Sequence, residues 1–262
     1  MEKQLQSNME YKSISKQEAL LLSLVEGSGL IVFGVRDLAK LSNWPRPRLH
    51  NTLASLLKKD IITRIKRGSF SLTKHLSGSA FAIATETVKP SYISFWTALS
   101  HLGFTEQQIM QVQLVSPKQS RRIWIGEIEV EVVALKPYRF FGYERKEGFV
   151  IAEPEKALID SLFLMEMSGG MDEVAKCLMY AWPSLNHRRF KNYVLRFRNK
   201  SLVSRAGYMI ERLGLGMEGL DGLVSASSRS YVPLDPSLKG VGERNRKWHV
   251  IINHKLSAEV IK

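Results

Sequence analysis

Residues 46–58 place their apolar side chains at the spacing of one face of an α-helix. Leu49, Leu53, Leu56 and Leu57 stand at positions i, i+4, i+7 and i+8, which predicts a helix with a single buried stripe. The opposite face is polar and carries Pro47, Arg48, Asn51, Ser55 and Lys58. Because Arg46 precedes a proline, which disfavours helical conformation, we place the start of this helix at Arg46 rather than at Ser42 or Trp44.

The pattern changes to period two directly after this helix. Ile61, Thr63 and Ile65 would share one face of a strand, and Ile62, Arg64 and Lys66 the other. The dipeptide 67–68 ends in glycine, which tolerates the positive φ of a tight turn, so residues 69–74 are expected to return as a second strand. The hairpin is basic, which indicates either contacts to phosphates or a solvated edge strand whose lysines prevent aggregation.

Three further elements precede the 46–58 helix. Ser15 and Glu18 have the spacing of a capping box, so a first helix is expected after Ser15 and should stop at the glycines of residues 27–29. A short strand over 31–33 and a two-turn helix over 35–41 follow. Helix, short strand, helix, turn, helix and two-stranded hairpin is the order of a winged helix-turn-helix domain. We assign this domain, with a polar N-terminal tail, to residues 1–79.

Residues 80–262 predict a larger, mixed α/β domain, so the fold class is α+β. We expect residues 80–90 to be an extended linker, followed by helices over 92–99 and 105–109. Runs rich in β-branched and aromatic residues predict strands over 111–115, 122–125, 128–135, 139–143 and 149–151. Helical patterns follow at 153–162, 171–181, 185–199 and 202–213, then a loop over 225–241 and a strand over 247–253.

The charge of the chain points to a polyanionic partner. The 262 residues are 44% hydrophobic and carry a formal net charge of +13. The first 75 residues hold 13 Lys and Arg against 6 Asp and Glu, so the positive charge is densest in the proposed DNA-binding domain. Nucleic acid is the common partner of such an excess, although many basic proteins bind no polyanion.

Cysteine usage and hydropathy favour a cytoplasmic protein. Cys177 is the one cysteine, which excludes an intramolecular disulfide and a cysteine-rich zinc site. No run of about 18 apolar residues predicts a membrane span. Residues 1–11 are polar and lack the apolar core of a signal peptide.

No strong catalytic pattern occurs, so we expect no enzyme activity, no cofactor and no metal. The chain has no Walker loop, no GxGxxG and no His-Glu-x-x-His, and its six histidines are scattered. The enzyme alternative is a metal-dependent nuclease built on Glu127, Glu129, Glu131 and Lys136. Glutamates that alternate along a strand are more often the solvent face of a sheet.

Double-stranded DNA is the expected partner. Arginine can fork onto guanine, asparagine onto adenine, and serine or lysine can bind phosphate. The candidate DNA-binding residues are Arg46, Arg48, Asn51, Ser55, Lys58, Lys59, Arg64, Lys66, Arg67 and Lys74. A second basic stretch is either another nucleic-acid surface or a solvated helix face; its residues are Arg188, Arg189, Lys191, Arg196 and Arg198.

Four motifs resemble the AbiEi-like antitoxins, the transcriptional regulators of AbiE-type toxin–antitoxin loci. They are YISFWTAL (92–99) with GFTEQ (103–107), EPEKALID (153–160), SRAGYMIE (204–211) and WHVIIN (248–253). Residues 33–70 resemble the winged helix of the same family. The motif residues Tyr92, Trp96, Gly207 and Tyr208 are expected to serve packing.

The resemblance implies an autorepressing antitoxin. Its winged helix would bind inverted repeats in its own promoter, and its C-terminal domain would oppose a nucleotidyltransferase-like toxin. The alternative is a protein-interaction module that neutralises such a toxin with little specific DNA binding.

Overall fold

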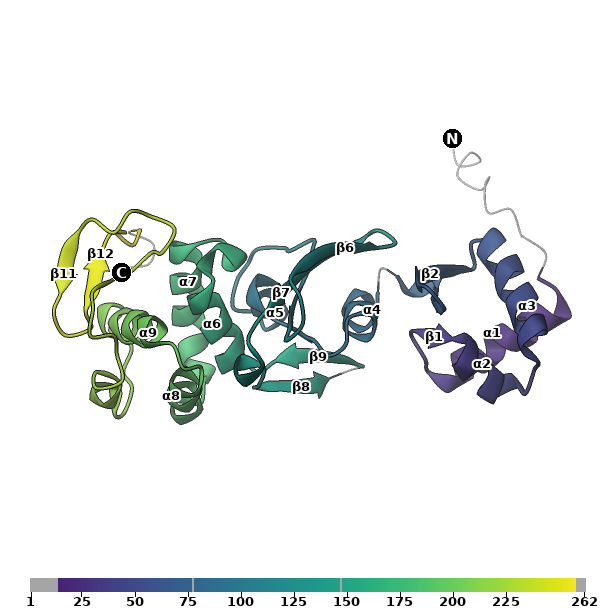
Figure 1. The fold of residues 1–262 in the computed structure, drawn as a ribbon, viewed down its shortest axis with the longest axis horizontal. Helices are drawn as coiled ribbons and strands as arrows, with labels where there is room; N and C mark the ends of the chain where they lie inside the picture. Colours follow the sequence, from purple (N-terminus) through teal and green to yellow (C-terminus); the bar gives the residue numbers. More distant parts are fainter. Residues whose placement is uncertain (1–13, 77, 147, 258–262) are drawn as a thin grey trace, which may run out of the picture. The chain divides into compact units, whose positions relative to one another are not determined.

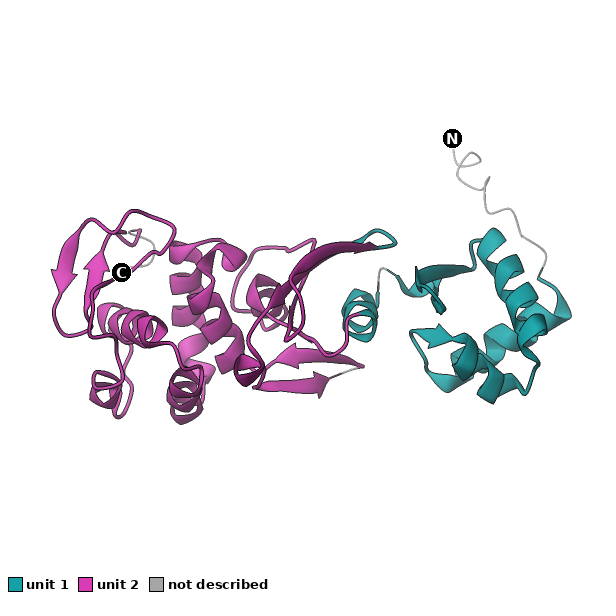
Figure 2. Cartoon of the chain, in the orientation of Figure 1, with its two compact units in different colours: residues 1–87, 125–128 teal, residues 88–124, 129–262 magenta. Residues whose placement is uncertain are grey.

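The computed structural model describes residues 14–76, 78–146 and 148–257 of a mixed α+β chain. Its contacts divide it into two units (Figure 2). Unit 1 comprises residues 1–87 and 125–128, and unit 2 comprises residues 88–124 and 129–262. The polar tail expected over residues 1–11 lies outside the described residues.

Three helices form most of unit 1, and their ends follow from the sequence. They are α1 (Lys16–Ser28), α2 (Val35–Ser42) and α3 (Arg46–Lys58). The capping box is confirmed, because the Glu18 amide donates to Ser15 Oγ at 3.3 Å and the Ser15 amide donates to Glu18 Oε2 at 2.6 Å. The start of α3 at Arg46 is also confirmed, with Pro45 as its N-cap.

A three-stranded antiparallel sheet completes unit 1. Its strands are β1 (Phe33–Gly34), β2 (Ile62–Lys66) and β3 (Ser69–Leu72), in the order β1-β3-β2. The expected leucine stripe of α3 is confirmed: Leu49, Leu53 and Leu56 are at most 2% exposed and pack in one core with Phe33 and Phe70. Burial of this stripe fixes which face of α3 meets solvent.

The strict alternation expected along β2 is wrong. Ile62 and Ile65 are both buried although they lie three residues apart. The cause is a shift in the pairing register between Arg64 and Lys66, where an extra residue in one strand returns the chain to the same face. Arg64 and Lys66 are nevertheless exposed, so the bulge keeps the hairpin basic on its outer side.

The expected extended linker is also wrong, because residues 80–87 form the helix α4 (Ala80–Thr87). The helix buries Ala82, Ile83 and Ala84. It belongs to unit 1, so the boundary between the units follows Thr87 rather than residue 79. Lys66 donates to the Thr87 carbonyl at 3.0 Å, which ties the end of β2 to this helix.

Unit 2 is built on a six-stranded sheet. Its strands are β4 (Tyr92–Ile93), β5 (Val112–Ser116), β6 (Arg121–Ile125), β7 (Ile128–Ala134), β8 (Tyr143–Lys146) and β9 (Phe149–Ala152), in the order β6-β7-β5-β4-β9-β8. Figure 1 labels β6, β7, β8 and β9 of this sheet. The strands expected at 111–115, 122–125, 128–135 and 149–151 are thus confirmed within one or two residues.

Three expectations for unit 2 are wrong. The helix expected from residue 92 begins as β4, a central strand, and becomes α5 (Phe95–His101) only after Ser94. No helix forms over 105–109. Of the strand expected over 139–143, only Tyr143 is in a strand, β8, because the short helix η2 (Pro137–Arg139) and Gly142, with φ of 70°, turn the chain before it.

Helices and a small second sheet make up the rest of unit 2. In chain order they are α6 (Pro154–Phe163), α7 (Met171–Ala181), α8 (His187–Arg196) and α9 (Lys200–Arg212), then β10 (Val232–Pro233), β11 (Glu243–Asn245) and β12 (Val250–Ile252). The short helices η1 (Thr73–His75), η3 (Met165–Ser168), η4 (Trp182–Ser184) and η5 (Leu220–Leu223) connect neighbouring elements. The strand order of the small sheet is β10-β12-β11. No helix in the described part of the chain has the length and apolar character needed to cross a membrane.

Candidate nucleic-acid interface

The solvent face of α3 carries the base-reading candidates. Arg48, Asn51 and Lys58 are exposed along one side of the helix, because the leucines of the opposite side are buried. Arg46 and Pro47 are exposed in its first turn. This face is therefore free of the core and presents hydrogen-bond donors and acceptors that suit base edges and phosphates.

The guanidinium of Arg48 lies over an aromatic ring. Its Cζ atom is 3.7 Å from the centroid of Trp44, a cation–π distance. Trp44 itself packs against the core of unit 1. Stacking on one face leaves the N–H groups at the edge of the guanidinium available, so Arg48 is held in place while it can still donate.

The turn between α2 and α3 holds this arrangement. Asn43 adopts the left-handed conformation with φ of 55°, and its amide donates to the Ala39 carbonyl at 3.0 Å. Ser42 Oγ donates to the Leu38 carbonyl at 2.7 Å and accepts from the Trp44 amide at 3.2 Å. These bonds fix the turn directly before Trp44.

Two of the candidates on α3 face α1 rather than the open side of the helix. Lys59 Nζ lies 2.7 Å from Glu18 Oε2, and the Ser55 hydroxyl also hydrogen-bonds Glu18. Chiefly through Lys59, these bonds lower the pKa of Glu18 from 4.5 to about 2. Ser55 and Lys59 therefore join α3 to α1, and their polar groups are engaged by Glu18 within unit 1.

The hairpin candidates divide in the same way. Arg64 and Arg67 are exposed, with Arg67 beside the turn at Gly68, whose φ is 76°. Lys66 is exposed but donates to the Thr87 carbonyl. Lys74 forms an ion pair with Glu26 of α1, and its hydrogen bond lowers the pKa of that carboxyl. Among the hairpin candidates, Arg64 and Arg67 therefore fit the expected phosphate contacts best.

A hollow that the sequence pattern does not single out lies at the start of α2. Its volume is about 440 Å³, and its lining residues are Gly34, Val35, Arg36, Asp37, Arg46, His50 and Gly68. Arg36 and His50 are not among the candidate residues predicted from the sequence. The two glycines, one before α2 and one in the hairpin turn, are the sequence signal for the close approach.

The second basic stretch is largely engaged within unit 2. Arg189 Nε lies 3.0 Å from Glu155 Oε2, and Lys191 lies against Gly219, where a Cβ would come within 2.6 Å of Nζ. Arg196 lies over Phe141 at 4.1 Å and Arg198 over Tyr138 at 5.7 Å. Arg188 is exposed on α8. This geometry favours the solvated helix face over a nucleic-acid surface.

A polar cluster is sealed in the core between β4 and α6. Lys156 forms an ion pair with Asp160, and its Nζ lies 2.7 Å from the Tyr92 hydroxyl. Asp160 Oδ2 also accepts from Tyr92 at 3.0 Å and from Ser94 Oγ at 2.7 Å. All four residues are 0% exposed. Desolvation is the main cause that lowers the pKa of Lys156 and raises that of Tyr92.

The carboxylates of the nuclease alternative are engaged or dispersed. Arg122 lies 3.4 Å from Glu129 Oε1 and 3.0 Å from Glu131 Oε1. Glu127 is exposed in the turn between β6 and β7, and Lys136 is exposed beyond the end of β7. Across the described ranges, no group of three or more His, Cys, Asp or Glu residues could hold a metal ion.

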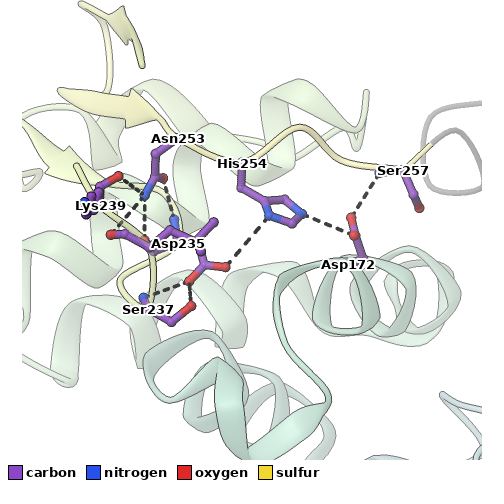
Figure 3. Close-up of polar contacts among 8 residues, drawn as sticks. Asp172, Asp235, Ser237, Lys239, Asn253, His254 and Ser257 are labelled. Carbon is purple, nitrogen blue, oxygen red and sulfur yellow. Dashed lines mark hydrogen bonds and ion pairs between the residues drawn. The ribbon is translucent and has the colours of Figure 1, made fainter. Parts of the chain in front are cut away.

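A further polar cluster fastens the C-terminal segment (Figure 3). His254 Nε2 is 3.2 Å from Asp172 Oδ2, at the start of α7, and its Nδ1 is 3.9 Å from Asp235 Oδ2. The Ser257 amide donates to Asp172 Oδ1 at 3.0 Å. Asn253 exchanges hydrogen bonds with the backbone of Asp235, so the cluster links the last strand, a loop and α7.

Comparison with known proteins finds a solved structure with a fold similar to that of this chain. No protein-family model matches the chain. No curated protein sequence matches it either. The chain is similar in structure to the RV2827C protein from Mycobacterium tuberculosis, with a TM-score of 0.63 and 13% sequence identity over 91% of this chain and 92% of that one. The two chains thus have a similar fold over nearly their whole lengths.

Proposed function

We propose that this protein is a sequence-specific DNA-binding transcriptional regulator whose unit 1 is a winged helix-turn-helix. The observation that carries the proposal is the exposed polar face of α3, where Arg48 and Asn51 stand one turn apart beside buried leucines. The order of α2, turn, α3 and a two-stranded hairpin supports it. In this proposal α3 enters the major groove and the β2–β3 hairpin is the wing.

The contacts divide into base reading and backbone binding. Arg48, held by Trp44, would fork onto guanine, and Asn51 would bind adenine. Lys58, Arg64 and Arg67 are exposed and would neutralise phosphates. Ser55, Lys59 and Lys74 are assigned to the packing of unit 1 instead, because their partners are Glu18 and Glu26 of α1.

We further propose that the regulator is an autorepressing antitoxin of an AbiE-type operon. Its DNA partner would be inverted repeats in its own promoter, and unit 2 would oppose a nucleotidyltransferase-like toxin. The resemblance rests on motifs that meet at packed positions of unit 2. Tyr92 of the first motif contacts Asp160 of the second, and Glu211 of the third accepts from Trp248 of the fourth.

A promoter reporter tests the regulatory role. The full chain should repress a reporter placed behind the DNA upstream of its own reading frame. Arg48→Ala and Asn51→Ala should each relieve this repression, whereas Arg188→Ala, an exposed arginine of α8, should leave it unchanged. Equal repression by wild type and the three variants would show that Arg48 and Asn51 of α3 do not contribute to repression.

The antitoxin role needs a separate readout. If the adjacent gene encodes a toxin that this protein opposes, coexpression of the two genes should restore the growth that the toxin alone prevents. Because Arg48 and Asn51 belong to unit 1, their variants should still restore growth if unit 2 is the neutralising part. Rescue that persists while the wild-type chain represses nothing would support the alternative of an interaction module without specific DNA binding.

A further inference from the structure

The hollow at the start of α2 lies beside the first turn of α3. Arg36 and Asp37 come from α2, Arg46 and His50 from α3, and Gly68 from the turn of the β2–β3 hairpin. These five residues are exposed, so the hollow is open to solvent. Three elements that are separate in sequence therefore meet at one small concave surface within unit 1.

The close approach of backbone at two glycines shapes the hollow. A Cβ at position 34 would stand 2.9 Å from the Gly68 carbonyl oxygen, so a side chain there would push the hairpin turn away from α2. Strand pairing places Gly34 opposite Ser69, directly after that turn. Gly68 has φ of 76°, a conformation that side chains disfavour. Backbone packing at these two glycines therefore contributes to the shape of the hollow.

The lining of the hollow suits an anion with several acceptor oxygens. Arg36 and Arg46 supply guanidinium groups, which offer planar, forked donors to phosphate oxygens. His50 adds a ring N–H. The carboxylate of Asp37 also lines the hollow, but its Oδ2 accepts from the Gly34 amide at 2.8 Å. That bond commits Asp37 to the start of α2, where its charge is favourable.

We propose that this hollow binds a phosphate group, held by Arg36, Arg46 and His50. The inference rests on the proposed DNA binding in so far as the phosphate belongs to a duplex backbone. A phosphate seated there would fix the position of the first turn of α3, and with it the register of Arg48 on the bases. A free phosphate-bearing molecule has the same chemistry and is the second source to be tested.

The first experiment measures DNA affinity of the full chain against salt, using the duplex upstream of its own reading frame. Arg36→Gln is compared with wild type and with Arg188→Gln, which removes one exposed charge outside the hollow. Loss of one phosphate contact lowers the slope of log K against log salt by about 0.9. Between about 50 and 200 mM salt, the affinity of wild type should therefore fall by a factor roughly 3.5 times larger than the affinity of Arg36→Gln does. The affinity of Arg188→Gln should fall as much as that of wild type.

Single neutral methylphosphonates in the duplex locate the contact. A methylphosphonate at one backbone position should weaken binding by wild type and by Arg188→Gln, and it should have a smaller effect on Arg36→Gln, because one of the phosphate's three partners in the hollow is already gone. Identical salt slopes and identical methylphosphonate effects in all three proteins would exclude the DNA backbone as the source of the phosphate.

The second experiment titrates inorganic phosphate into the full chain and follows the backbone amide signals of Gly34 and Gly68 by NMR. Shifts in wild type that are absent in Arg36→Gln would assign the hollow to phosphate even if no DNA binds, and only the proposed function would then fail. Unshifted signals together with unchanged DNA slopes would overturn the proposal. The amide spectra of the variants also show whether each has kept its fold.

Discussion

The indole ring of Trp248 occupies the space in which a side chain at position 207 would stand. A Cβ built on Gly207, within α9, would lie 2.1 Å from Cζ3 of the ring. Trp248 Nε1 donates to Glu211 Oε2, one turn further along α9, at 2.5 Å. Trp248 is 0% exposed. The close approach of ring and backbone thus packs the turn between β11 and β12 against α9.

Gly207→Ala should destabilise unit 2 although alanine favours helices. The added methyl forces the buried ring or the helix to shift, at a cost of about 1–3 kcal/mol. Gly27→Ala in α1 is the matched control, because nothing lies within 4 Å of a Cβ there. That substitution should be neutral or stabilise by up to about 1 kcal/mol. Urea denaturation followed by tryptophan fluorescence measures both, and equal midpoints for the two variants would contradict the packing described.

The buried pair Lys156–Asp160 predicts a second, larger loss of stability. Lys156→Met leaves the Asp160 carboxylate buried without its cation, which costs about 3–5 kcal/mol. The double variant Lys156→Met, Asp160→Leu should recover part of this loss, because no charge is then buried. Arg122→Met, which breaks an exposed pair with Glu131, should cost at most about 1 kcal/mol. Denaturation of wild type and these three variants measures the losses of stability, and a double variant no more stable than Lys156→Met would refute the pairing argument.

Glu18 predicts how unit 1 responds to acid. Its pKa is lowered to about 2 in the folded protein from 4.5, first through the hydrogen bond from Lys59. A lowered pKa contributes stability that is fully present above pH 4.5 and is lost as the pH falls towards about 2. Glu18→Gln should be less stable at neutral pH and show a flatter dependence over this window. Circular dichroism melts from pH 7 to about 2 measure it, and parallel curves for wild type and variant would disprove the linkage.

The stack of Arg48 on Trp44 predicts a loss of base discrimination without a loss of charge. Arg48→Lys keeps the cation but cannot fork onto one guanine, so discrimination at that base pair should fall by about 1–3 kcal/mol. Trp44→Leu should have a smaller effect at the same position. Lys58→Ala, which removes an exposed lysine of the same helix, should weaken all sequences alike. Competition with operators changed one base pair at a time separates these outcomes.

Local patterns made much of unit 1 predictable from its sequence. The leucines of α3 and the capping box at Ser15 depend on residues within one or two turns, and both form as expected. The bulge at Ile65 depends on pairing with β3, which the local sequence pattern does not show. The strand at Tyr92 is two residues long, which is too short to show a hydrophobic period. The helix over 80–87 was missed because its residues lack an amphipathic stripe.

The candidate site was predictable only as far as its helical faces. Arg48 and Asn51 are exposed as the α3 pattern requires. By contrast, Lys59 and Lys74 find their carboxylates 41 and 48 residues away in sequence, a separation that no local pattern spans. The hollow likewise joins Gly34 to Gly68 through strand pairing. Charge shows which residues are able to bind phosphate, whereas tertiary contacts decide which of them remain available.

The affinity of the full chain for the DNA upstream of its own reading frame tests the central claim most directly. Fluorescence anisotropy at physiological salt compares that duplex with a scrambled duplex of the same length and composition. The account predicts binding to the upstream duplex at least roughly 10³-fold tighter than to the scrambled one, with a large part of this preference lost in Arg48→Ala. Equal affinity of wild type for the two duplexes would contradict it.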